Sequence, residues 1–139
     1  MANPSTATRK SVRPRLAAGE AVATIGVKNL KEARKFYEDT LGFEPEDVRG
    51  GEVAIYASAA TRVFVYESAF AGTNKATAAT WMSDDVDAVA ASLKARGVKF
   101  EHYDFPDMTR EGDVHVSGAM RAAWFKDPDG NILAIVNGG

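Results

Sequence analysis

Phe125-Lys126-Asp127-Pro128-Asp129-Gly130-Asn131-Ile132 is the most strongly patterned stretch of this chain. It separates two runs of β-forming residues, 121–126 and 132–136. Pro128 fixes its own φ, Asp127 can cap the turn through its carboxylate, and Gly130 tolerates positive φ. The stretch therefore predicts a β-hairpin at the end of the chain.

Two helices are predicted upstream, and they share one pattern. Asn29 and Asp85 each occupy an N-cap position before an apolar stripe, and Gly42 and Gly97 stand where the helices end. An offset of 56 residues superposes the two segments, because it places Asn29 on Asp85, Leu30 on Val86, Ala33 on Val89 and Tyr37 on Leu93. The chain is therefore a tandem repeat.

Strand-like runs surround each predicted helix. In the first module one run, 21–27, precedes the helix, and the runs 48–49, 53–57 and 62–67 follow it. In the second module the run 77–83 precedes the helix, and 99–103, 114–116 and the final hairpin follow it. We therefore expect an α+β fold of two βαβββ modules, about 20–68 and 76–137, within one domain spanning 20–139. Each helix covers one face of its sheet, so the opposite faces are expected to line a cavity.

Composition limits the classes of function. The chain of 139 residues has no cysteine, which excludes disulfides and thiolate ligands. Residues 1–19 contain four basic residues and no acidic one, and we expect a disordered arm there; the rest has 13 basic against 19 acidic residues, which argues against nucleic-acid binding. We find neither a membrane-spanning run nor a signal sequence, and we expect a cytoplasmic protein that does not bind membranes.

Segments 71–74, 103–106 and 123–125 resemble a bacterial glyoxalase-like subgroup of the vicinal oxygen chelate superfamily, which includes glyoxalases, bleomycin-resistance proteins and extradiol dioxygenases. Three ordered motifs resemble those of the superfamily as a whole. They are residues 27–37 with Leu41-Gly42-Phe43, Asp84-Asp85-Val86 with Arg96-Gly97-Val98, and Phe125 to Asn131. The resemblance implies an eight-stranded open cup, a small-molecule ligand and a homodimer. In metal-dependent members, His, Gln or Glu side chains hold a divalent ion inside the cup.

The positions that hold the metal in this family have lost their ligands here. By the resemblance they fall on Val22, Ala78 and Ala134, none of which can bind a metal. The fourth lies within residues 63–67, where only Glu67 is a possible ligand. We therefore expect no metal cofactor; if a metal is bound, the remaining candidates are Glu67, His102 and His115.

The expected cup lining is small or apolar. By the family register the lining includes Thr24 and Gly26 in the first module and Thr80, Met82 and Ala134 in the second. Further candidate ligand contacts are three aromatic residues that can stack on a ligand and a cation that can pair with an anionic group: Tyr56, Tyr66, Trp124 and Arg121. The loop 104–112 is long enough to act as a lid or simply to connect two strands.

His115 is the candidate catalytic residue. Strand alternation predicts that Asp113 and His115 share a face, so Asp113 could orient His115 as a general base. The leading hypothesis is nevertheless a metal-free protein that binds an apolar or aromatic molecule. The alternative is a lyase, isomerase or dioxygenase-type enzyme that acts on a vicinal-oxygen substrate through a metal or His115. A third class, an interaction module, predicts a filled cup.

Overall fold

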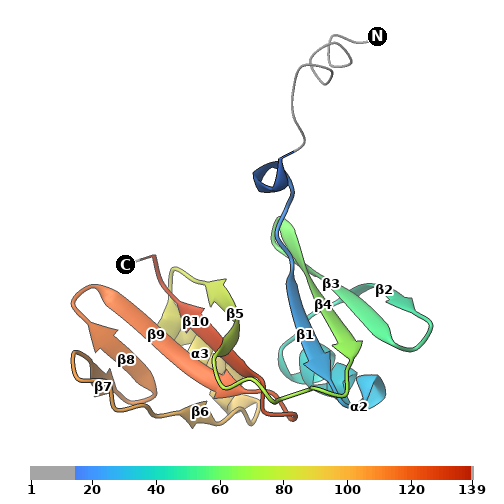
Figure 1. The fold of residues 1–139 in the computed structure, drawn as a ribbon. Coiled ribbons are helices and arrows are strands. Elements are labelled where there is room, and N and C mark those ends of the chain that lie inside the picture. The colour runs from blue at the N-terminus through green and yellow to red at the C-terminus, as the bar shows by residue number, and fades with distance from the viewer. Residues whose placement is uncertain (1–14, 139) are drawn as a thin grey trace.

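The structure is a computed structural model that describes residues 15–138 (Figure 1). Most of the predicted N-terminal arm lies outside these residues, but its last part contains a short 3-10 helix, η1 (Leu16–Ala18). No helix within 15–138 is long and apolar enough to cross a bilayer.

The first module forms a four-stranded sheet. Its strands are β1 (Ala23–Val27), β2 (Pro45–Arg49), β3 (Val53–Ser58) and β4 (Thr61–Glu67), in the spatial order β1-β4-β3-β2. The first and last strands, β1 and β4, pair in parallel, whereas the other neighbours are antiparallel. This is the sheet that the repeat predicted.

The second module repeats this arrangement and extends it. Strands β5 (Thr77–Met82), β10 (Ile132–Val136), β9 (Met120–Lys126), β8 (Val114–Ser117) and β7 (Thr109–Glu111) follow one another across the sheet, and β6 (Phe100–Glu101) also pairs with β9. Again the first and last strands, β5 and β10, are parallel. The predicted loop 104–112 therefore contains a short strand of its own.

The two helices begin with equivalent caps. Asn29 Oδ1 accepts the backbone N–H of Glu32 before α2 (Leu30–Arg34), and Asp85 Oδ1 accepts that of Ala88 before α3 (Val86–Ala95), both at 3.0 Å. These bonds confirm both predicted N-caps. The first helix then continues as a π-helical turn, η2 (Lys35–Thr40), whereas α3 is α-helical throughout.

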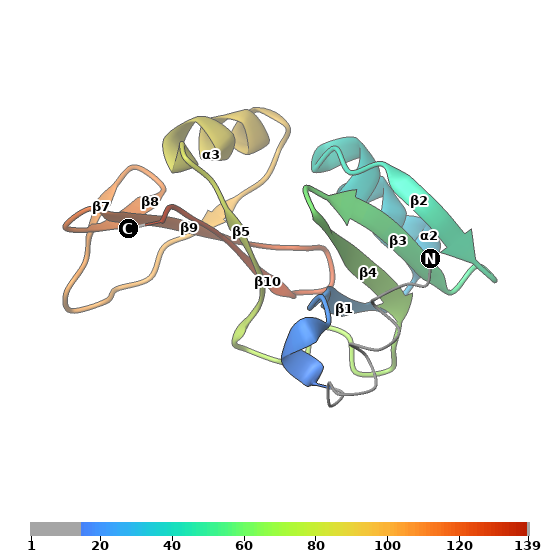
Figure 2. The same ribbon diagram turned by 90° about the horizontal axis from the view of Figure 1, so that it is seen from above.

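The helix-facing sides of the two sheets share one core. The ring of Phe36 lies 6.4 Å from that of Phe125, and the ring of Phe43 lies 5.6 Å from that of Trp81. Buried residues of both modules belong to this cluster, and β1 and β5 lie at the adjoining edges of the sheets (Figure 2). Because the helix-facing sides meet, the opposite faces of the two sheets point away from each other.

The Asp127 turn fastens the modules together. The Tyr37 hydroxyl donates to Asp127 Oδ2 at 2.7 Å, and the Asn131 side-chain amide donates to the same oxygen and to the backbone carbonyl of Gly26, both at 2.8 Å. Asp127 Oδ1 accepts the backbone N–H groups of Asp129 and Asn131. The linker lies directly against this turn, since a Cβ atom on Gly72 would lie 1.8 Å from the Asp129 carbonyl oxygen.

Candidate functional site

The face of the second sheet turned away from α3 carries the candidate site. In the ladder, Thr80 pairs with Ala134 and Ala134 pairs with Trp124, so these three side chains share a face. His115 pairs with Ala122, two residues before Trp124, and belongs to the same face. Phe125 and Leu133, one residue away in the alternation, lie in the core.

Four aromatic rings gather on this face. The Trp124 ring lies 5.0 Å from His115, 5.5 Å from Tyr103 and 5.5 Å from Phe105, measured between centroids. These separations are typical of favourable aromatic pairs. Tyr103 and Phe105 follow β6, so its outgoing chain folds over the sheet and brings them onto Trp124.

A cavity of about 600 Å³ opens beside this cluster, which we call the aromatic pocket. Its volume is within the range of small-molecule sites. The walls come from β5, β9, β10, the linker and the chain after β6. The lining residues are Gly72, Asn74, Lys75, Ala76, Thr77, Tyr103, Phe105, Trp124, Lys126, Gly130 and Ile132.

His115 supports the pocket from beneath. The ring is 1% exposed, and its Nε2 accepts the backbone N–H of Tyr103 at 2.9 Å. The neutral ring therefore carries its proton on Nδ1, which has no hydrogen-bond partner within residues 15–138. Burial lowers the pKa of His115 below its ordinary value of 6.5. With its only lone pair already accepting a hydrogen bond, His115 is not placed to act as a general base.

The expected Asp113–His115 pair is wrong. Asp113 precedes β8 in a turn, and its carboxylate contacts His102 at 2.8 Å and Lys94 of α3 at 3.1 Å. Both partners hold the pKa of Asp113 below its ordinary value, with His102 the larger influence. Alternation does not extend to Asp113, because that residue lies before the strand begins.

Tyr103 presents a polar group without a partner. Its hydroxyl is buried and makes no hydrogen bond within the described part of the chain. Burial, and secondarily the charge of Glu101, raise the pKa of Tyr103, so the hydroxyl keeps its proton at neutral pH. Nearby, the Trp124 indole N–H donates to the Thr77 hydroxyl at 3.3 Å, which fixes the orientation of the indole.

Two expected ligand contacts lie elsewhere. Tyr56 is fully buried on the helix side of its sheet, where its hydroxyl donates to Glu38 at 2.9 Å. Arg121 is bound by two carboxylates, Asp87 at 2.7 Å and Glu111 at 2.8 Å, and its alternation with Ala122 puts it on the α3 side. Neither side chain reaches the aromatic pocket.

The other expected cup residues do not converge on one cavity. Thr24 and Tyr66 lie on the outer face of the first sheet, and the space above Gly26 is filled by the linker, since a Cβ there would lie 3.1 Å from Ser68 Cβ. Thr80 and Met82 line a separate cavity of about 370 Å³ between β1 and β5. Ala134 is buried at the centre of the second sheet. Of the expected contacts, only Trp124 lines the aromatic pocket.

The alternative metal set is not assembled. Glu67 Oε2 accepts the backbone N–H of Leu30 at 2.9 Å and so caps α2. His102 is paired with Asp113, and His115 lies beneath Trp124. Among residues 15–138, no three His, Asp or Glu side chains are placed to share a metal ion. With Val22, Ala78 and Ala134 at the family positions, the donor set does not fit the family's usual metal.

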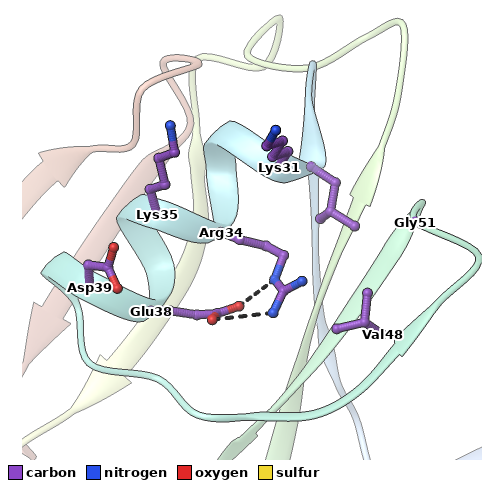
Figure 3. A pocket seen from close by; sticks show the side chains of 8 residues that line it. Lys31, Arg34, Lys35, Glu38, Asp39, Val48 and Gly51 are labelled. Atoms are coloured by element: carbon purple, nitrogen blue, oxygen red, sulfur yellow. Dashed lines mark hydrogen bonds and ion pairs between the residues drawn. The ribbon is translucent and has the colours of Figure 1, made fainter.

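A second cavity, of about 250 Å³, lies between α2 and β2 (Figure 3). Its central cation, Arg34, is bound to Glu38 at 2.6 Å, and this carboxylate also accepts the Tyr56 hydroxyl. The Arg34 guanidinium and Tyr56 hold the pKa of Glu38 below its ordinary value. Figure 3 shows Lys31 and Lys35 directed away from this pair. The central groups of this groove, Arg34 and Glu38, thus satisfy one another together with Tyr56.

The comparisons with known proteins agree with this architecture. The family model described as Glyoxalase/Bleomycin resistance protein/Dioxygenase superfamily matches residues 20–135. The chain belongs to this superfamily. No match was found among curated proteins.

Several solved structures of the superfamily share the fold. Lactoylglutathione lyase from Agrobacterium tumefaciens aligns with a TM-score of 0.65 at 16% identity, over 90% of this chain and 96% of that chain. TnmS3, an antibiotic binding protein from Streptomyces sp. CB03234, aligns with a TM-score of 0.58 at 24% identity, over 86% and 97%. The fosfomycin resistance protein FosX from Listeria monocytogenes gives 0.64 at 18%, over 87% and 93%. At these identities the likeness establishes the fold alone.

Proposed function

We propose that this superfamily member binds an aromatic small molecule in the aromatic pocket and does not use the superfamily's usual metal. The observation that supports this most directly is the packing of Tyr103 and Phe105 onto Trp124 beside a cavity of about 600 Å³. Phe105 is 41% exposed although it is a large apolar side chain. A flat guest would cover that surface and stack on the exposed ring faces.

The residues favour binding over catalysis. The nitrogen of His115 that could take a proton accepts a hydrogen bond, and the carboxylate of Glu67 caps a helix. No general base and no cluster of metal ligands is therefore placed at the pocket within residues 15–138. The alternative lyase, isomerase or dioxygenase-type enzyme lacks a specific observation in its favour.

A second copy of the chain is proposed to complete the cup. The outer faces of the two sheets point away from each other, so one chain supplies two separate walls. Tyr66 on the first face, Phe70 in the linker and Met82 on the second face are exposed large apolar side chains. Such exposure is typical of an interface. A monomeric mass in sedimentation at micromolar protein would contradict this part of the proposal.

The two tryptophans make ligand binding directly measurable. Trp81 is partly buried against the core, outside the aromatic pocket, and Trp124 lines that pocket, so the Trp81→Phe variant leaves one reporter at the site. We expect an aromatic ligand to change the fluorescence of Trp81→Phe and to raise its unfolding temperature. The matched Trp124→Phe variant should bind more weakly and lose the fluorescence response. Metal-dependent turnover that survived Trp124→Phe but required Glu67 would support the enzyme instead.

A further inference from the structure

We propose that the ligand of the aromatic pocket carries an acidic group, such as a carboxylate or an acidic phenol, on its aromatic body. The inference rests on the proposed function and specifies the chemical class of the ligand. Whereas the sequence predicted a small or apolar cup lining, two lysines line this pocket.

The charge of the lining is opposite to that of the chain. Lys75 and Lys126 both line the aromatic pocket, and no Asp or Glu is among the lining residues. The whole chain has a formal charge of −2. A positive lining on an acidic protein is a local feature, and it favours an anion over a neutral or cationic guest.

Both lysines have charge available for a ligand. Lys75 makes no ion pair within residues 15–138. Lys126 Nζ lies 3.8 Å from Glu101 Oε1. Among the ion pairs of these residues, only that between Arg62 and Glu20 is equally long. The groove beside α2 provides the contrast, because its Arg34 is bound to Glu38 at 2.6 Å. The cations of the aromatic pocket are therefore not neutralised by close contact with protein carboxylates.

The remaining polar groups suit an acidic oxygen. The Tyr103 hydroxyl stays protonated and has no hydrogen-bond partner within residues 15–138, so its O–H is available as a donor to a ligand that reaches it. Lys75 comes from the linker and Lys126 from the end of β9, so the two cations approach the aromatic rings from different elements. A flat acid can stack on Trp124 and direct its oxygens to either lysine.

The test uses two probes of nearly the same shape. Calorimetric titration of the full chain with 2-naphthoate and with 2-naphthamide compares a carboxylate with a neutral amide on the same ring system. We expect the carboxylate to bind roughly tenfold more tightly at low salt, and the difference to shrink at high salt because exposed charges are screened.

Variants identify the source of this preference. Lys75→Gln with Lys126→Gln should bring the two affinities to within about twofold, whereas Lys99→Gln, an exposed lysine outside the pocket, should leave the preference intact. Thermal unfolding confirms that the variants remain folded.

Three outcomes would count against one or both proposals. Equal binding of the two probes by the unaltered protein would overturn the inference and leave the proposed function standing. A preference that persisted in the double variant would also overturn it. If neither probe bound and Trp124 fluorescence did not respond, the proposed function would fail together with the inference.

Discussion

The helix of the first module changes to a π-helical turn at Lys35, whereas α3 remains regular from Val86 to Ala95. Two residues of the π turn make hydrogen bonds toward the interior. The Tyr37 hydroxyl donates to Asp127, and Glu38 accepts the Tyr56 hydroxyl. The second module has Leu93 at the position equivalent to Tyr37, and it packs in the core without a polar contact.

The outer faces of the two sheets also differ. The outer face of the first sheet carries Phe64 and Tyr66, two residues apart on β4, whereas in the second module the chain between β6 and β7 folds over the outer face of the sheet. That segment supplies Tyr103 and Phe105. One repeated plan thus yields a module that anchors the fold and a module that forms a pocket.

The junction between the modules should give the largest effect. Gly72→Ala places a Cβ on the Asp129 carbonyl and requires a positive φ of 70°, and we expect a loss of about 3 kcal/mol in unfolding free energy. Urea denaturation measures this loss. Gly118→Ala is the control, since it has a similar φ but open space around the new Cβ, and it should cost roughly 1 kcal/mol. Equal losses would show that the linker does not depend on contact with the turn.

The next largest effect is the loss of stability when the hydroxyl of Tyr37 or of Tyr56 is removed. Tyr37→Phe leaves Asp127 without its contact to the first module, and we expect a loss of about 2 kcal/mol. Tyr56→Phe removes a bond to the partly exposed Glu38 and should cost about 1 kcal/mol. The same urea experiment applies to both. A larger loss for Tyr56→Phe would place the critical hydrogen bond within the first module instead of between the modules.

The two helix caps should behave alike. Asn29→Ala and Asp85→Ala each remove one side-chain bond of 3.0 Å to the first turn, and each should cost about 1 kcal/mol. Because Glu67 also holds the N-terminus of α2, helix content measured by circular dichroism should fall less for Asn29→Ala than for Asp85→Ala. The reverse order would mean that the Glu67 contact does not support α2.

Protonation of His115 should affect the second module, because this residue lies in β8. The pKa of His115 is lowered by burial, so its contribution to stability is complete above pH 6.5 and declines as the pH falls below that value. Proton NMR of the His102→Gln variant, which retains a single imidazole, measures this pKa directly. A His115 pKa at or above 6.5 would contradict the buried, neutral ring.

The sequence predicted the repeat and its caps because those features depend on local residues. Asn29 and Asp85 need only the next turn of backbone, and the Asp127 turn depends on Pro128 and Gly130. Each signal lies within a few positions of the bond that it makes. The tandem βαβββ fold followed from them.

The site was harder to predict, for two physical reasons. Both faces of β3 are apolar, with Ala54, Ile55 and Tyr56 all buried, so alternation could not show that Tyr56 faces the helix. The pocket also depends on residues distant in sequence, since Lys75 in the linker and Trp124 in β9 come to line the same cavity only after the chain folds. The pairing of Asp113 with His102 likewise could not be predicted, because these residues are 11 positions apart and meet only in the folded chain.

The parallel pairing of first and last strands has a consequence for the order of folding. Within the second module, Thr80 must pair with Ala134, so the parallel ladder at the β5 edge of that sheet closes a loop of about 50 residues. During synthesis, β1 to β4 can assemble while the later half is still being made. The strands that form the floor of the pocket are complete only when Val136 has emerged, so the pocket can form only after every strand of the first module has been made.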